Sequence, residues 1–172
     1  ELPVFDSAPG DMALDTDPGN CSAVTTWSDP TTSDNCGIQG SGSSHTSGMS
    51  FPVGDTTVTM TLDDINGNSA SHSFTITVTD NEAPELAAMP GSMSSTNDPD
   101  QCGASVSWSE PTSSDNCPGE GTTSSHTSGE FFDVGTTTVS YIVTDTAGNS
   151  SSYSFDVTVT DDPSVLADSG AM

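Results

Sequence analysis

The sequence contains no lysine and no arginine, although 25 of its 172 residues are aspartate or glutamate and its formal net charge is −25. Nucleic-acid binding requires basic side chains that neutralise phosphates, so this composition excludes it. The absence of bases equally excludes Schiff-base lysine chemistry, arginine-assisted phosphoryl transfer and electrostatic binding to anionic membranes. It also excludes an isopeptide bond made by lysine. Only three histidines could carry a positive side-chain charge.

Because no cationic side chain is available to pair with the acids, their mutual repulsion has to be relieved from outside the chain. Salt can do this by screening, and bound divalent cations can do it by direct contact. Calcium is the expected cofactor, since it takes carboxylate, amide and backbone carbonyl oxygens as ligands.

Long apolar runs are also missing. No stretch approaches the roughly 20 residues needed for a transmembrane helix, and no signal peptide is recognisable. The chain begins at Glu1, where its first repeat begins. We therefore expect a mature, processed protein that is not inserted in a membrane and that is located outside the cell or on its surface.

What the sequence does contain is one unit repeated twice, with an offset of 81 residues. Cys21 aligns with Cys102, Trp27 with Trp108, and the same register holds to the end of the second copy. An ungapped repeat of this length indicates a tandem duplication of a folded domain. We predict domains at residues 1–81 and 82–162, followed by a tail at 163–172.

The four cysteines fall two to a repeat, about 15 residues apart. This spacing predicts one disulfide inside each repeat, Cys21 with Cys36 and Cys102 with Cys117, and hence an oxidising compartment. Closing a loop of this length contributes roughly 3 kcal/mol in the chain-entropy account, which matters for domains of about 80 residues. Free thiols are the alternative, and a zinc site is disfavoured because no CxxC spacing occurs.

Short alternating segments bounded by turn residues predict an all-β fold. Each repeat has a strand leading to its tryptophan, at 21–27 and 102–108, and β-branched strands at 58–64 and 139–145. Last strands follow at 74–80 and 155–161, after glycine-containing hairpin turns. Pro9-Gly10 and Pro90-Gly91 interrupt the first strand of each repeat, which predicts an edge strand that changes partners. Many short strands with frequent turns are typical of an antiparallel β-sandwich.

The residues resemble a known family at this point. Each repeat has, in order, Cys, Trp, Asp-Asn-Cys, Ser-His-x-Ser-Gly, Phe-x-Val-Gly, Thr-Thr-Val, Asp, Gly-Asn and a final Thr-Val-Thr-Asp that follows Ile in the first repeat and Val in the second. This series is similar to the hyalin repeat, or HYR module. The resemblance covers both repeats. It implies two tandem immunoglobulin-like β-sandwiches of an extracellular protein, an intra-repeat disulfide, and a role in adhesion or surface architecture rather than catalysis. We therefore expect no enzymatic activity.

The expected calcium ligands lie at the two ends of each domain. The hairpin acids Asp64 and Asp145 should face whatever precedes their domain, and the linker at 80–82, which resembles the calcium linkers of cadherins, should face Asp145. The predicted disulfides would bring the Asp-Asn pairs at 34–35 and 115–116 to the opposite end, where each last strand leaves. The predicted ligand set is Glu1, Asp34, Asn35, Asp64, Asp80, Asn81, Glu82, Asp115, Asn116, Asp145, Asp161 and Asp162. The alternative is that these Asp and Asn residues only cap turns.

Other candidate sites are weaker. Asn20 and Asn149 lie in glycosylation sequons. Trp27 and Trp108 each end an alternating strand, which favours a place in the core over a sugar platform. One aligned histidine in each repeat, His45 and His126, is not a ligand set. The tail residues Val165, Leu166 and Met172 have no further repeat to enter, so either the tail packs on the next subunit or it folds back on its own domain.

Two functions follow from these observations. The first is a secreted structural subunit that assembles with itself, head to tail, into a surface filament stabilised by calcium and disulfides. The second is an adhesin module that binds a glycan or a protein through its loops at 37–42 and 118–123.

Overall fold

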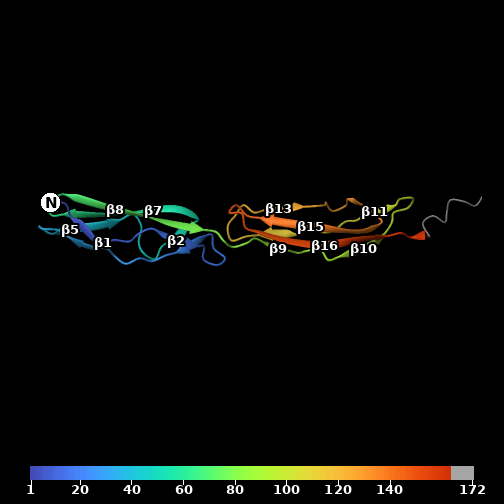
Figure 1. Ribbon diagram of the computed structural model, residues 1–172, viewed down its shortest axis with the longest axis horizontal. Helices are drawn as coiled ribbons and strands as arrows, with labels where there is room; N and C mark the ends of the chain where they lie inside the picture. Colours follow the sequence, from blue (N-terminus) through green and yellow to red (C-terminus); the bar gives the residue numbers. More distant parts are fainter. Residues whose placement is uncertain (164–172) are drawn as a thin grey trace, which may run out of the picture. The chain divides into compact units, whose positions relative to one another are not determined.

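The computed structural model describes residues 1–163 and divides the chain into two compact units, Glu1–Glu82 and Ala83–Met172. Both units are built from β-strands, so the prediction of an all-β protein with tandem sandwich domains is confirmed (Figure 1). No helix in the described part of the chain is long and apolar enough to cross a membrane. The tail residues Val165, Leu166 and Met172 lie outside the described residues.

The first unit combines one four-stranded sheet with two short strand pairs. In the large sheet the order is β2-β8-β7-β5, and the short pairs are β1 with β4 and β3 with β6. The strands are β1 Val4–Ser7, β2 Met12–Asp15, β3 Ser22–Val24, β4 Thr31–Ser33, β5 Ile38–Ser43, β6 Ser50–Pro52, β7 Gly54–Asp64 and β8 Ser69–Thr79.

The second unit repeats this topology strand for strand. Its large sheet has the order β10-β16-β15-β13, and its short pairs are β9 with β12 and β11 with β14. The strands are β9 Glu85–Ala87, β10 Met93–Thr96, β11 Gly103–Ser105, β12 Thr112–Ser114, β13 Gly121–Ser124, β14 Phe131–Asp133, β15 Gly135–Thr144 and β16 Ser150–Thr160.

The first strand of each repeat changes sheets, as the Pro-Gly interruption predicts. In the first unit β1 pairs antiparallel with β4, and after Pro9-Gly10 the chain continues as β2, which pairs parallel with β8. Proline has no N–H to donate to a ladder, and it therefore stands between the two pairings. The parallel pairing sets Asp15 beside Thr79, where the chain leaves the unit.

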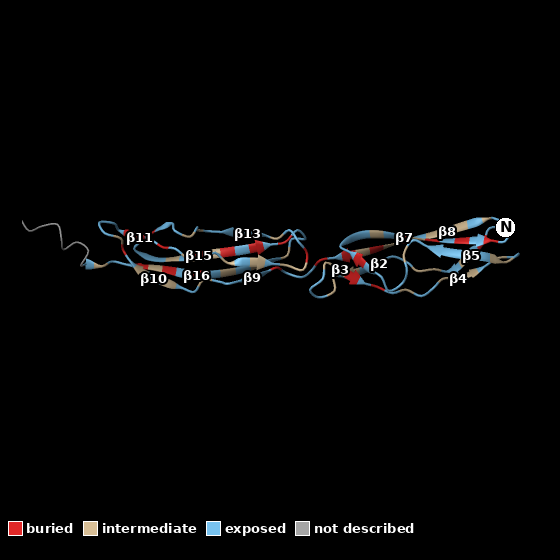
Figure 2. Ribbon diagram, turned by 180° about the vertical axis from the view of Figure 1, so that it is seen from behind, coloured by how far each residue is buried: buried red, intermediate tan, exposed pale blue. Residues whose placement is uncertain are grey.

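The core of each unit lies between its large sheet and its short pairs. Alternate residues of the β7–β8 and β15–β16 hairpins point inward, and Figure 2 shows the resulting buried segments on β15 and β16. In the first unit Trp27 packs edge-on against Phe74, with 5.3 Å between ring centroids, and Trp108 packs on Phe155 at 5.4 Å in the second. Both tryptophans are thus part of the core packing.

The tryptophan strands are shorter than the alternation predicts. β3 covers only Ser22–Val24, and the N–H of Trp27 donates to the hydroxyl of Ser47 at 2.9 Å instead of continuing a ladder. Side-chain hydroxyls compete with strand pairing in this way because they offer the backbone a local partner. The hairpin strands are longer than predicted, since β7 begins at Gly54, whose φ of 105° suits glycine.

Candidate functional site

The hairpin acids Asp64 and Asp145 are caps of their own turns. Oδ1 of Asp64 accepts from the N–H groups of Asn66 and Asn68, both at 2.8 Å, and Oδ2 accepts from Asn68 Nδ2 at 2.6 Å. Asp145 uses Gly148 and Asn149 in the same way, at 2.6 and 2.8 Å, with Asn149 Nδ2 at 2.8 Å. Asp64 is fully buried and Asp145 is 7% exposed. These asparagine partners were not predicted from the sequence, although the Gly-Asn that ends each hairpin turn, at 67–68 and 148–149, contained the signal.

These hydrogen bonds hold both hairpin acids in the charged form. The side-chain hydrogen bond from Asn68 is the main cause of the lowered pKa of Asp64, and it outweighs desolvation. Burial by itself raises the pKa of Asp145, but hydrogen bonds from Asn149 and from backbone N–H groups of its turn outweigh it, so the net shift is downward. Each repeat therefore carries a fixed negative charge at its hairpin.

A second acid in each repeat lies in the loop before the second cysteine. Asp34 Oδ2 accepts from the N–H groups of Cys36 at 2.7 Å and Gly37 at 2.9 Å, and Asp115 Oδ2 accepts from Cys117 at 3.0 Å. Oδ1 of Asp34 and Oδ1 of Asp115 are buried with no hydrogen-bond partner in the described part of the chain. A buried carboxylate oxygen without a donor is costly unless a cation or water meets it.

The loop acid and the hairpin acid meet at the same end of the domain, which we call its N-terminal end. In the second unit a carboxylate oxygen of Asp115 lies within 4.8 Å of one of Asp145. In the first unit the N–H of Ile65 donates to the carbonyl of Gly37 at 3.2 Å, which ties the two loops together. Asn68 also donates to the carbonyl of Glu1 at 3.3 Å. Asn35 and Asn116 lie in the same loops as these acids.

The linker acids lie at the other end of the first unit, which we call its C-terminal end. Asp80 is 4% exposed and accepts from the N–H of Glu82 at 3.2 Å. Asn81 donates to Asp15 at 2.6 Å, and the N–H of Gly19 donates to Glu82 at 2.9 Å.

The corresponding end of the second unit carries the last predicted ligands. The N–H of Asp162 donates to Asn97 Oδ1 at 2.7 Å, and Asp161 is exposed. Sequence reasoning missed three members of these two ends, Asp15, Gly19 and Asn97. The positions of Asp15 and Asn97 depend on the parallel contact of the second strand of each repeat with the last, and Gly19 lies in the turn that follows.

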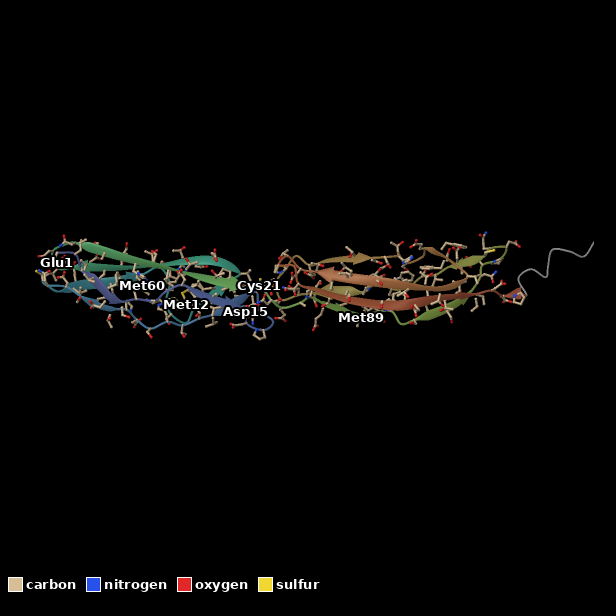
Figure 3. The ribbon with its side chains drawn as sticks, in the orientation of Figure 1. Glu1, Met12, Asp15, Cys21, Met60 and Met89 are labelled. Carbon is tan, nitrogen blue, oxygen red and sulfur yellow. The ribbon has the colours of Figure 1, made fainter. Side chains whose placement is uncertain are left out.

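The predicted intra-repeat disulfides are wrong for this structure. Cys36 and Cys102 are free and exposed, while Cys21 and Cys117 are the disulfide-bonded cysteines. Cys21 follows the turn that contacts Glu82, whereas Cys36 stands beside the loop tied to Ile65. Figure 3 accordingly shows Cys21 near Asp15, at the end of the first unit away from Glu1. The two members of the predicted pair thus lie at opposite ends of one domain, and a disulfide needs Cα atoms within about 7 Å.

The loop acids also lie at another end of the domain than predicted. Asp34 and Asp115 were expected near the end from which each last strand leaves, drawn there by the disulfides. They lie instead beside the hairpins that carry Asp64 and Asp145, at the N-terminal end.

The glycosylation sequons stay predictions. The amide nitrogen of Asn20 donates to the carbonyl of Pro18 at 3.1 Å in an exposed turn. The amide nitrogen of Asn149 donates to Asp145, so a glycan on this atom would compete with the hairpin cap. His45 and His126 pack on Phe51 and Phe132, with 5.5 and 5.4 Å between ring centroids.

The fold and its ends define a class of protein: tandem β-sandwich repeats that carry acid clusters at the domain ends and have no cationic side chain except histidine. The chain belongs to the HYR domain family, which matches residues 1–78 and 79–159.

Three relatives illustrate the similarity. The chain is 38% identical over 151 residues to the mouse (Mus musculus) sushi, von Willebrand factor type A, EGF and pentraxin domain-containing protein 1, covering 83% of this chain and 4% of that protein. It is 41% identical over 114 residues to hyalin of Strongylocentrotus purpuratus, covering 63% of this chain and 9% of hyalin. Hyalin of Lytechinus variegatus is 35% identical over 147 residues, covering 82% of this chain and 28% of hyalin. The chain thus spans only a small part of each relative.

Proposed function

We propose that this chain is a non-catalytic structural module of an extracellular or cell-surface protein, that its acidic domain ends bind calcium, and that it assembles with itself head to tail. Membership of the HYR family and similarity to hyalin support the structural role. The observation that carries the calcium proposal is the pair of carboxylates at the N-terminal end of the second domain.

Within that pair, Asp145 is held in the charged form by its turn, and Asp115 has a buried carboxylate oxygen that no donor of the described residues reaches. Two like charges within 4.8 Å repel each other, and the chain has no lysine or arginine to place between them. A calcium ion would reverse the sign of this interaction and provide the orphan oxygen with a partner.

Carbonyl oxygens of the loops and water could complete the six to eight ligands that calcium takes. In the first domain Asp34, Asp64 and the carbonyl of Glu1 provide the corresponding groups. The participation of the linker residues Asp80, Asn81 and Glu82, and of Asp161 and Asp162, remains a prediction from the sequence.

A calcium titration of the full chain tests the proposal, with thermal unfolding and light scattering as readouts and EDTA for reversal. A ligand that binds only the folded form at 10 to 100 times its Kd adds about 1.4 to 2.7 kcal/mol. For a domain of this size that corresponds to a melting temperature higher by roughly 6 to 20 °C. Growth of the scattering particle with calcium would support assembly.

The variant Asp115→Asn sharpens this test, because its effect should change sign. In EDTA it removes a repulsion and should be at least as stable as the parent protein. In calcium it loses a ligand and should be less stable than the parent. Asp133→Asn, at an exposed position in β14, is the matched control for the change of charge. If calcium stabilises the parent and Asp115→Asn equally, the carboxylate pair is not the site.

A groove in the first unit favours a second candidate function, adhesion through a bound ligand. The groove has a volume of about 410 Å³ and is lined by aromatic and polar side chains, among them Phe5, Trp27, Asp29 and His45. This size is within the range of small-molecule sites. Met60 lies in its wall, and the equivalent residue of the second repeat is Tyr141, whose hydroxyl contacts Trp108 and Glu110.

Met60→Tyr should therefore fill the groove and abolish any binding there while leaving the fold intact. A screen of soluble glycans by nuclear magnetic resonance, run on the parent and on this variant, would test the candidate. Shifts confined to groove residues in the parent would support it, and no shift with any glycan would count against a glycan ligand.

A further inference from the structure

Each repeat carries one cysteine at each end of its domain. Cys21 and Cys102 occupy equivalent positions at the C-terminal ends, and Cys36 and Cys117 occupy equivalent positions at the N-terminal ends. Of each equivalent pair, one member is disulfide-bonded, Cys21 or Cys117, and the other, Cys102 or Cys36, is free and exposed. The same position in the repeat is thus bonded in one copy and free in the other.

The bonded Cys21 and the free Cys102 lie in turns that have the same backbone hydrogen bonds in the two repeats. The N–H of Asp17 donates to the carbonyl of Ser22, the first residue of β3, at 2.8 Å, and the N–H of Asp98 donates to the carbonyl of Gly103, the first residue of β11, at 2.7 Å. The carboxylates of these two aspartates then accept from the next strand, at 2.9 and 3.0 Å. Cys102 is therefore held as Cys21 is.

The N-terminal ends show the same agreement. The N–H groups of Cys36 and Cys117 donate to the carboxylates of Asp34 and Asp115, at 2.7 and 3.0 Å. The cysteine that is bonded in each repeat comes from unlike ends, the C-terminal end of the first and the N-terminal end of the second. The two free cysteines also come from unlike ends, Cys36 from the N-terminal end of the first domain and Cys102 from the C-terminal end of the second.

We infer that Cys102 of one copy of this chain and Cys36 of a second copy form an intermolecular disulfide, so that the chain links covalently head to tail. The inference rests on the head-to-tail assembly proposed above and gives it a specific covalent partner. Both thiols are exposed and need no unfolding to react.

The oxidant is a small-molecule disulfide such as oxidised glutathione. The thiolate of Cys102 attacks its S–S bond, forms a mixed disulfide and releases one glutathione thiolate. The thiolate of Cys36 from the second copy attacks the protein-bound sulfur and releases the other. Two protein thiols lose their protons and electrons, one protein disulfide forms, and one oxidised glutathione becomes two reduced molecules.

Three proteins test the inference: the full chain, Cys36→Ser and Cys102→Ser, the last carrying a tag that changes its size. Each is incubated in a glutathione redox buffer and analysed on a non-reducing gel. The full chain should give a ladder of multimers that collapses with reductant. Each variant alone should remain monomeric, because it retains only one kind of end. Their mixture should give a heterodimer and nothing larger.

The linkage can be mapped with an endoproteinase that cuts after acids, since the chain offers trypsin no site. A peptide joining Cys102 to Cys36 is expected. Homodimers formed as readily by each variant alone would overturn the pairing of unlike ends. Peptides joining Cys21 to Cys36, or monomers whose thiols have closed on one another, would overturn the intermolecular bond. Calcium-dependent growth in light scattering without any cross-link would overturn this inference and leave the assembly itself standing.

Discussion

Replacing Tyr141 by phenylalanine tests whether the second domain depends on a polar bridge inside its sandwich. The Tyr141 side chain is 2% exposed, and its hydroxyl accepts from Trp108 Nε1 at 2.6 Å and donates to Glu110 at 2.5 Å. Burial is the main cause of the raised pKa of Tyr141, and the Glu110 hydrogen bond raises it further. The hydroxyl therefore stays protonated and able to donate. The variant keeps the ring and removes both hydrogen bonds.

The expected loss follows from the two partners. A neutral hydrogen bond contributes about 1 kcal/mol and one to a charged group about 1.5 to 3 kcal/mol. Glu110 is exposed and Trp108 is partly exposed, so water can replace part of each contact. We therefore expect a loss of about 2 kcal/mol, somewhat below the full sum of about 2.5 to 4 kcal/mol, which corresponds to a melting temperature lower by roughly 8 to 16 °C.

Urea unfolding followed by fluorescence measures this loss for the second domain alone if Trp27 is first replaced by phenylalanine. Trp108 is then the only tryptophan. Tyr153→Phe is the matched control, because within the described residues its hydroxyl makes one hydrogen bond, to the neutral carbonyl of Pro90 at 2.6 Å, and should lose about half as much. Equal stability of Tyr141→Phe and the parent would refute the bridge as a stabilising feature.

Two further predictions concern packing and pH. Gly103→Ala should destabilise the second domain by about 1 to 3 kcal/mol, because a Cβ there would lie 2.2 Å from the Phe132 carbonyl oxygen, whereas Gly121→Ala meets nothing within 4 Å and should be nearly neutral in the same urea assay. Stability should rise as the pH falls from 7 toward the pI of about 4.1, because the net charge diminishes. Below about pH 3.8 it should fall, since the folded-state pKa values of Asp64 and Asp145 lie below that ordinary value and the contribution of these charges is lost as the pH falls through them. A monotonic rise down to pH 2 in urea unfolding would contradict the role of the caps.

The strands and turns were predictable because the signals for them lie in neighbouring residues of the sequence. These signals are the alternation of apolar and polar residues in the long hairpins, the Pro-Gly interruption and the glycine turns. They predict the strands without any knowledge of contacts between distant residues. Prediction was weakest at 28–50 and 109–130, where β4, β5, β12 and β13 are short and polar. Serine and threonine side chains bond the backbone there, so no hydrophobic period marks the strands.

The cysteine pairing was not predictable from spacing alone. A spacing of 15 residues brings two cysteines together if the chain between them turns back. Here the chain between Cys21 and Cys36 instead crosses the domain from one end to the other. Extended chain rises about 3.3 Å per residue, so such a spacing fits a crossing as well as a loop. The placement of Asp34 and Asp115 was wrong for the same reason, because it was derived from the pairing.

The lack of bases changes how buried acids are stabilised. In most proteins a buried carboxylate pairs with arginine or lysine, and here the hydrogen bonds that hold Asp64 and Asp145 come from N–H groups of their own turns. Such donors are neutral, so they lower the pKa of an acid without cancelling its charge. The charge therefore stays at the domain ends and acts on any neighbouring acid. A repeat built in this way can carry strong hydrogen bonds within its turns and still require a cation from solution where two acids meet. For this reason the unpartnered oxygen of Asp115, rather than the fully bonded Asp145, is the atom whose replacement distinguishes turn capping from metal binding.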